Sequence, residues 1–129
     1  MGPRVGNLLK SVMVGVLATT AALCVDGRAS AQDGAVSPEI LAEGEALYLK
    51  NCRQCHGTKG TAGTPLKANA KLENADFVVE TILVGPGYMT GFAEHLNDEE
   101  IALLATFVRN NWGNEFGAVS PDIVTPHRK

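Results

Sequence analysis

The sequence lacks several features that would point to common classes of protein. Its 11 lysines and arginines are outnumbered by 14 aspartates and glutamates, so no overall basic excess is present for binding nucleic acid. It has no internal repeat and no alternation of strand-like and helix-like segments, so a βαβ scaffold is not expected. No uncharged apolar run reaches the roughly 20 residues that a membrane-spanning helix needs. The sequence therefore predicts neither nucleic-acid binding nor a permanent membrane anchor.

The first 31 residues have the order of segments that is typical of a secretory signal peptide. Arg4 and Lys10 precede an uncharged, mostly apolar run over residues 12–25, and the small residues Ala29-Ser30-Ala31 follow it. We expect cleavage after residue 31 and export to the periplasm. The remaining residues 32–129 suffice for one small domain with a net charge of about −5. A domain of this size often depends on a bound group or a cross-link for stability.

Caps and apolar spacing predict two helices before residue 85. Ser37-Pro38 is a good helix start, and the apolar spacing continues to about residue 50. Asn74 suggests a second start, followed by apolar residues at helical spacing over residues 75–84. The β-branched residues of that stretch leave a strand open as an alternative. The glycines and the proline of residues 57–72 indicate a loop.

A third helix is the clearest element of the sequence. Asn97 and Glu100 have the spacing of a capping box, and an apolar stripe runs from Ile101 to Trp112. Gly113 follows as a helix-ending glycine. We expect an all-α domain over residues 32–114, with a tail without periodic pattern over residues 115–129.

The chemistry of the sequence is concentrated in Cys52-Arg53-Gln54-Cys55-His56. This C-x-x-C-H spacing is the attachment motif of a c-type haem, in which both thiols bond one macrocycle edge and the histidine binds the iron. A redox dithiol would need a βαβ scaffold, and a structural zinc site would need a second close pair of ligands. A short disulfide would leave His56 without a role. We therefore predict one covalent haem c per chain, held through Cys52 and Cys55, with His56 as an axial ligand.

Met89 is the expected second axial ligand. It is the only methionine after residue 31, and it lies in a glycine-bounded loop rather than on a helix face. Its soft thioether suits haem iron opposite a histidine. His95 and His127 are rival candidates, but we expect both to be solvent-exposed. Ligation by histidine and methionine would leave no position for a substrate, which favours an electron carrier over an enzyme.

With these motifs in view, the sequence resembles the class I monohaem cytochromes c of bacterial periplasms. The resemblance covers nearly all of residues 38–114, and it implies a fold of three to five short helices wrapped around one covalently bound haem. It implies close crossing of the first and last helices at Gly44, and a hydrogen bond from His56 to the carbonyl of Pro65. Further haem-pocket residues follow from it as well: Tyr48, Leu66, Phe92 and Trp112.

The resemblance is closest to small cytochromes that accept electrons from periplasmic dehydrogenases of alcohols, sugars or sulfite. It implies such a dehydrogenase as donor and a terminal oxidase or another cytochrome as acceptor. Two alternatives stay open: a permanent haem subunit of a dehydrogenase complex, and a haem enzyme or sensor in which Met89 is displaced. The oligomeric state, monomer or weak dimer, is left open too.

Charge is distributed unevenly around the attachment motif. Residues 50–71 contain five basic side chains and no acidic one, although the chain as a whole is acidic. The segment is either an ordinary solvated loop or a patch that steers the haem edge towards an acidic partner.

Overall fold

The computed structural model describes residues 36–128, and within that range it contains helices and no strands. The predicted signal peptide therefore lies outside the described residues. The helices, listed in chain order, are α1 (Pro38–Asn51), α2 (Arg53–His56), η1 (Ala70–Glu73), α3 (Ala75–Val84), α4 (Asp98–Arg109), α5 (Pro121–Val124) and η2 (Thr125–His127). This confirms the all-α fold class and resolves the 75–84 stretch as helix. None of these helices is both long enough and apolar enough to cross a membrane.

Each of the three predicted helices begins at the predicted cap. The backbone N–H of Ile40 donates to the Ser37 hydroxyl at 3.3 Å, and that of Phe77 donates to the Asn74 side chain at 3.0 Å. At the start of α4, Asn97 and Glu100 exchange side-chain to backbone hydrogen bonds at 2.9 Å in both directions. Such caps satisfy backbone donors that a helix start leaves unpaired, each worth about 1 kcal/mol.

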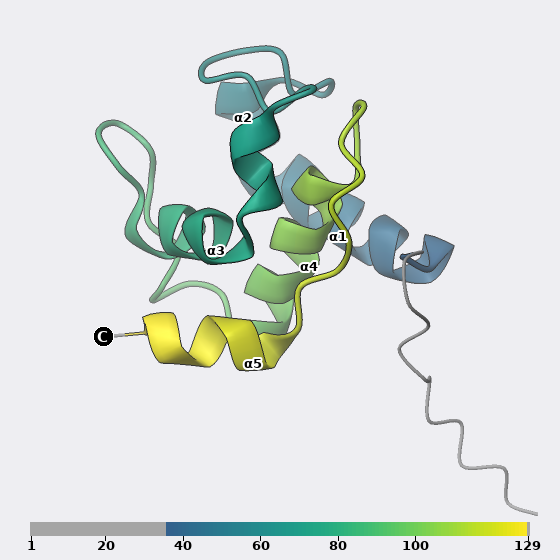
Figure 1. Ribbon diagram of the computed structural model, residues 1–129. Helices are drawn as coiled ribbons and strands as arrows, with labels where there is room; N and C mark the ends of the chain where they lie inside the picture. The colour runs from purple at the N-terminus through teal and green to yellow at the C-terminus, as the bar shows by residue number, and fades with distance from the viewer. Residues whose placement is uncertain (1–35, 129) are drawn as a thin grey trace, which may run out of the picture. The chain divides into compact units, whose positions relative to one another are not determined.

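The packing of α1 against α4 forms the centre of the domain (Figure 1). Gly44 allows the close approach: a Cβ at this position would lie 2.6 Å from the carbonyl oxygen of Leu103 and 2.7 Å from Cβ of Phe107. Beside this crossing, the rings of Tyr48, Phe107 and Trp112 contact one another with centroid distances of 5.0–5.3 Å. Aromatic pairs at such distances add about 0.5–1.5 kcal/mol each beyond the area they bury.

The end of α4 differs from the prediction. The helix ends at Arg109, whereas the apolar stripe had predicted helix as far as Trp112. The backbone of Trp112 has a positive φ of 52°, so the indole leaves the helix direction and its ring stacks over Gly60. The chain can turn there because the Asn110 side chain bonds both backbone groups of Gly117, which draws the following segment back along the helix.

Arg109 fixes the same turn from inside the protein. Its side chain is 5% exposed and donates hydrogen bonds of 2.8–2.9 Å to the carbonyls of Leu72, Glu73 and Gly117. Burial lowers the pKa of this guanidinium, and the nearby Glu73 carboxylate acts in the opposite direction. The three carbonyls replace the water that the buried cation loses, so Arg109 ties η1 and the segment after α4 to the core.

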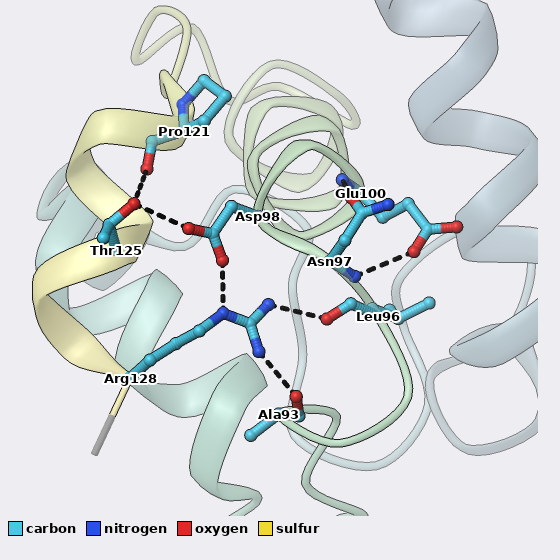
Figure 2. Close-up of polar contacts among 8 residues, drawn as sticks. All are labelled: Ala93, Leu96, Asn97, Asp98, Glu100, Pro121, Thr125 and Arg128. Carbon is cyan, nitrogen blue, oxygen red and sulfur yellow. Dashed lines mark hydrogen bonds and ion pairs between the residues drawn. The ribbon is translucent and has the colours of Figure 1, made fainter.

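The predicted tail is wrong as a description of residues 119–128. Val119 and Val124 are buried, and α5 packs against α3 and α4. Figure 2 shows the anchor: the Arg128 guanidinium pairs with the Asp98 carboxylate and donates to the backbone carbonyls of Ala93 and Leu96. The segment has two prolines and α5 is only four residues long, which is too short for an apolar period to predict this packing.

The C-terminal segment carries a second side-chain contact. His127 Nε2 lies 2.9 Å from a carboxylate oxygen of Asp76 at the start of α3, and the histidine side chain is only 23% exposed. The expectation that His127 is solvent-exposed is therefore wrong. It is instead part of the contact between the chain end and α3.

Candidate haem-binding site

The attachment motif forms one short helical turn directly after α1. Cys52 ends α1 with its backbone N–H bonded to the Tyr48 carbonyl at 2.8 Å, and its own carbonyl accepts from His56 N at 3.0 Å. Residues three apart on a helical turn lie on the same side. The backbone therefore presents the Cys52 and Cys55 side chains towards one side, as bonding to one macrocycle edge requires.

His56 is held in a single tautomer. Its Nδ1 lies 3.1 Å from the carbonyl oxygen of Thr64. A carbonyl only accepts hydrogen bonds, so Nδ1 carries the proton, and in the neutral ring Nε2 then has the free lone pair. The resemblance implied the carbonyl of Pro65 as the partner, and this is wrong by one residue: the Pro65 carbonyl accepts from the Asn69 side chain at 2.8 Å instead. The lone pair on Nε2 is what an axial iron ligand needs.

The two thiols have different surroundings. Cys52 is half-buried, and burial raises the pKa of its thiol to about 11, with a further contribution from Cys55. Cys55 is exposed. Cys52 is therefore a neutral thiol at pH 7, unlike the thiolates of reactive redox pairs and zinc sites.

The geometry also disfavours the alternative roles of the cysteines. Both are free rather than joined to each other. In residues 36–128, no three histidine, cysteine, aspartate or glutamate side chains come together as metal ligands would. A zinc site built from the C-x-x-C pair therefore has no further ligands in this part of the chain.

Tyr48 lies beneath the attachment turn rather than on its surface. The side chain is fully buried, and its hydroxyl donates a 2.6 Å hydrogen bond to the carbonyl of Gly57, the residue after His56. Burial raises the pKa of this phenol to about 12, with a smaller contribution from Cys52. Tyr48 thus supports the turn from the core side, where it also contacts Trp112.

Met89 lies half-buried in the loop between α3 and α4. Two glycines shape this loop: a Cβ on Gly85 would lie 2.3 Å from Gly91 N, and a Cβ on Gly91 would lie 2.6 Å from the carbonyl oxygen of Val84. The Phe92 N–H then bonds the Ile82 carbonyl at 3.0 Å, which returns the chain to α3. No hydrogen bond of the described residues joins this loop to the attachment turn.

The remaining predicted pocket residues are partly buried. Leu66, Phe92 and Trp112 pack against the core without being enclosed by it. His95, the rival ligand, is exposed as expected. The donor set of two thiols, an imidazole with Nε2 free and a thioether on a separate loop fits a c-type haem. Hydrogen bonds join His56 to Thr64 and Cys52 to Tyr48, and no hydrogen bond of residues 36–128 joins His56 to Met89.

Two residues of the site were missed by sequence reasoning. Asn69 and Asn114 hold the loop that contains Thr64 and Pro65, through hydrogen bonds described below. Isolated asparagines in loops are common as turn residues, so their spacing carries no signal of this role.

An all-helical domain with this attachment turn defines a c-type cytochrome. Comparison with known protein families supports the same conclusion: the family described as "Cytochrome C oxidase, cbb3-type, subunit III" matches residues 39–108, more than half of the chain. The chain belongs to this family of cytochrome c domains.

Two curated relatives are similar to the chain. Cytochrome c4 of Thiocapsa roseopersicina is 32% identical over 95 residues, which cover 59% of this chain and 50% of the relative. The cytochrome c subunit of the quinone-type alcohol dehydrogenase of Gluconobacter oxydans is 32% identical over 88 residues, which cover 55% of this chain and 18% of the relative. The chain thus matches half of the first relative and less than a fifth of the second.

Proposed function

We propose that this protein carries single electrons on one haem c, bonded through Cys52 and Cys55 and ligated by His56 and Met89. The observation that carries the proposal is the fixed His56 tautomer, with Nδ1 bonded to a carbonyl and Nε2 free, on the turn that presents both thiols. When bound, the haem supplies an iron that alternates between the ferrous and ferric states. The chain supplies two covalent anchors, two axial ligands and an apolar support.

Met89 decides whether the site carries electrons or binds a small ligand. With sulfur opposite the imidazole, no axial position is left for an external molecule, and a thioether favours the ferrous state more than a second histidine would. The rival function, a haem enzyme or sensor, requires this sulfur to leave the iron. Gly85 and Gly91 close the loop so tightly that side chains at either position would collide with backbone, which supports a fixed Met89.

The experiment is expression of the full chain together with cytochrome c maturation machinery. We expect a coloured protein whose mass exceeds that of the polypeptide by one haem, and a sulfur-to-iron charge-transfer band in the ferric state. Met89→Ala should lose the band and bind carbon monoxide rapidly when reduced. Met89→Ala that keeps the band, or a wild-type protein that binds carbon monoxide at once, would exclude ligation by Met89.

We further propose export of the chain, with residues 1–31 as a cleaved signal peptide and residues 32–114 as the cytochrome domain. The C-terminal segment packs on that domain through Val119, Val124 and Arg128, so we assign it to the same folded unit. Intact mass and N-terminal sequencing of the periplasmic product should give Gln32 as the first residue. A product that keeps residues 1–31 would contradict the signal peptide.

For the partners, we propose a periplasmic dehydrogenase of alcohols, sugars or sulfite as donor and a terminal oxidase or another cytochrome as acceptor. The similarity to a cytochrome c subunit of an alcohol dehydrogenase supports this class of donor. The same similarity favours the second candidate, a permanent haem subunit of such an enzyme. Purification of the chain from periplasmic extract separates the two: a stable subunit brings a larger catalytic chain with it through gel filtration, and a mobile carrier does not.

The basic segment around the attachment turn is the proposed docking surface for an acidic partner. Its five basic side chains are all exposed, and none takes part in an ion pair within residues 36–128: Lys50, Arg53, Lys59, Lys67 and Lys71. Unpaired charges of one sign raise encounter rates with an oppositely charged surface. Lys59→Glu/Lys67→Glu should slow reduction by the donor most at low salt. Reduction by a small uncharged reductant is the control and should stay constant. An unchanged rate with the donor would mean that the segment is an ordinary solvated loop.

A further inference from the structure

We propose that Asn69 and Asn114 are positioning residues for His56, which hold the Thr64 carbonyl in place and thereby tune the iron's redox equilibrium. The inference rests on the proposed function, because it concerns the histidine that would ligate the haem. Neither asparagine touches the imidazole. Both act through the loop whose Thr64 carbonyl accepts the His56 hydrogen bond.

The loop needs such support because the side chains of Thr64 and Pro65 make few stabilising contacts with the core. Thr64 and Pro65 are both exposed, so no burial of apolar surface fixes the carbonyl that faces His56. On the N-terminal side, Gly63 lies close to the attachment turn, where a Cβ would be 3.0 Å from the Cys55 carbonyl. On the C-terminal side, the position of the Thr64–Pro65 segment depends on hydrogen bonds.

Asn69 supplies the first of these bonds. Its Nδ2 donates to the Pro65 carbonyl at 2.8 Å, one residue after the carbonyl that binds His56. Its Oδ1 accepts from Lys71 N at 3.1 Å and so caps η1. One side chain therefore links the histidine-holding segment to the start of a helix.

Asn114 connects this loop to the core. The residue is 2% exposed, although it follows the end of α4. Its Oδ1 accepts from Asn69 N at 3.0 Å, and its Nδ2 donates to the carbonyls of Leu66 at 2.8 Å and Val108 at 2.9 Å. Because Val108 belongs to α4, the loop is fixed to the helix that forms the centre of the domain. A buried amide with both of its polar atoms bonded to backbone holds those segments in one arrangement.

The consequence concerns the electronic character of His56. A well-aligned acceptor at Nδ1–H makes the imidazole a stronger donor at Nε2, and a stronger donor stabilises ferric iron relative to ferrous iron. Loss of the Asn69 bond to Pro65 would let the Thr64 carbonyl move away from Nδ1. The imidazole would then donate less electron density to the iron, and the redox equilibrium would shift towards the ferrous state.

Asn69→Ser tests this with little other change. Serine can still cap η1, but it is too short to reach the Pro65 carbonyl. Asn69→Thr, which keeps the cap with a larger side chain, is measured in parallel. Thr106→Val is the matched control, since it removes two buried side-chain hydrogen bonds to the backbone of Val119 and neither of them reaches the loop. All variants are prepared as the haem-loaded full chain.

Two readouts separate positioning from general stability. The first is the ferrous-to-ferric ratio in a redox titration, which we expect to rise by about threefold to tenfold in both Asn69 variants, as the loss of one hydrogen bond implies. The second is hydrogen exchange of His56 Nδ1–H by NMR in the ferrous protein, which should be faster in both variants. Thr106→Val should leave both readouts unchanged while it lowers thermal stability.

An unchanged redox ratio and unchanged exchange in the Asn69 variants would overturn the inference. A similar shift in Thr106→Val would also overturn it, since the effect would then reflect stability alone. In either case a normal haem spectrum of the wild type would leave the proposed function standing. A wild-type protein without haem would instead refute the proposed function and this inference together.

Discussion

Tyr48→Phe offers a direct test of how the core holds the attachment turn. The substitution keeps the ring that contacts Phe107 and Trp112, and removes only the hydroxyl that donates to the Gly57 carbonyl at 2.6 Å. A hydrogen bond of this kind contributes a net 0.5–1.5 kcal/mol, so we expect the free energy of unfolding to fall by about 1 kcal/mol. For a domain of about this size, that corresponds to a decrease in Tm of roughly 4–8 °C.

The assay is thermal unfolding of the haem-loaded protein, followed by circular dichroism at pH 7. The chain contains its own matched control in Tyr88→Phe, since Tyr88 is fully exposed and makes no side-chain hydrogen bond within residues 36–128. We expect the Tm of that variant to equal the wild-type value. Equal Tm values for Tyr48→Phe and Tyr88→Phe would refute the role assigned to the Tyr48 hydroxyl.

The same tyrosine predicts a pH dependence with a defined sign. Burial raises the pKa of Tyr48 from 10.0 to about 12 in the folded protein. The folded state therefore keeps a proton that the unfolded state loses, so the contribution is fully present below pH 10 and is lost as the pH rises towards 12. Stability should fall across this window in the wild type and less steeply in Tyr48→Phe. Parallel curves for the two proteins would show that Tyr48 does not titrate in this way.

Three further predictions concern the packing of the domain. Gly44→Val should lower the free energy of unfolding by about 1–3 kcal/mol, because the new side chain would collide with α4. The control is Ala46→Val at an exposed site of α1, which should lower it by only a few tenths of a kcal/mol. Chemical denaturation of the two variants measures both values. Arg109→Met should lower the free energy of unfolding by about 1.5–3 kcal/mol in the same assay, since three buried or partly buried carbonyls lose a charged donor. A variant as stable as the wild type would contradict this role. The pKa of Asp98 is lowered by the Thr125 hydroxyl and then by Arg128, so its contribution is present above the ordinary pKa and lost as the pH falls through the lowered value. The protection factors of amides in residues 119–128, which compare their exchange with that of an unfolded chain at the same pH, should therefore fall in strong acid. In Asp98→Asn they should be low already at pH 7.

Local interactions made the helix starts predictable. The caps of Ser37, Asn74 and Asn97 depend on residues three positions away, so the pattern and its structural cause lie in the same short segment. The attachment motif is local for the same reason, because Cys52, Cys55 and His56 share one helical turn. Sequence spacing is sufficient information for features of this kind.

The wrong predictions involve contacts that extend beyond a single helical turn, whether to a nearby loop or to a distant segment. The apolar stripe that ends in Trp112 has helical spacing, but the contact between Asn110 and Gly117 turns the chain before the helix reaches it. The helix that ends at Val124 is only four residues long, too short for a reliable apolar pattern, and its packing is on α3 and α4.

The starts of the three main helices and the short helical turn of the attachment motif were predictable from the sequence alone, since each depends on neighbours within one or two helical turns. The carbonyl that accepts the His56 hydrogen bond, Thr64 rather than Pro65, became known from the fold. The fold also decided that Asn114, 45 residues along the chain from Asn69, holds that loop. The physical reason is that a buried polar side chain bonds whichever backbone groups the fold brings to it, and residue spacing does not encode which groups those are.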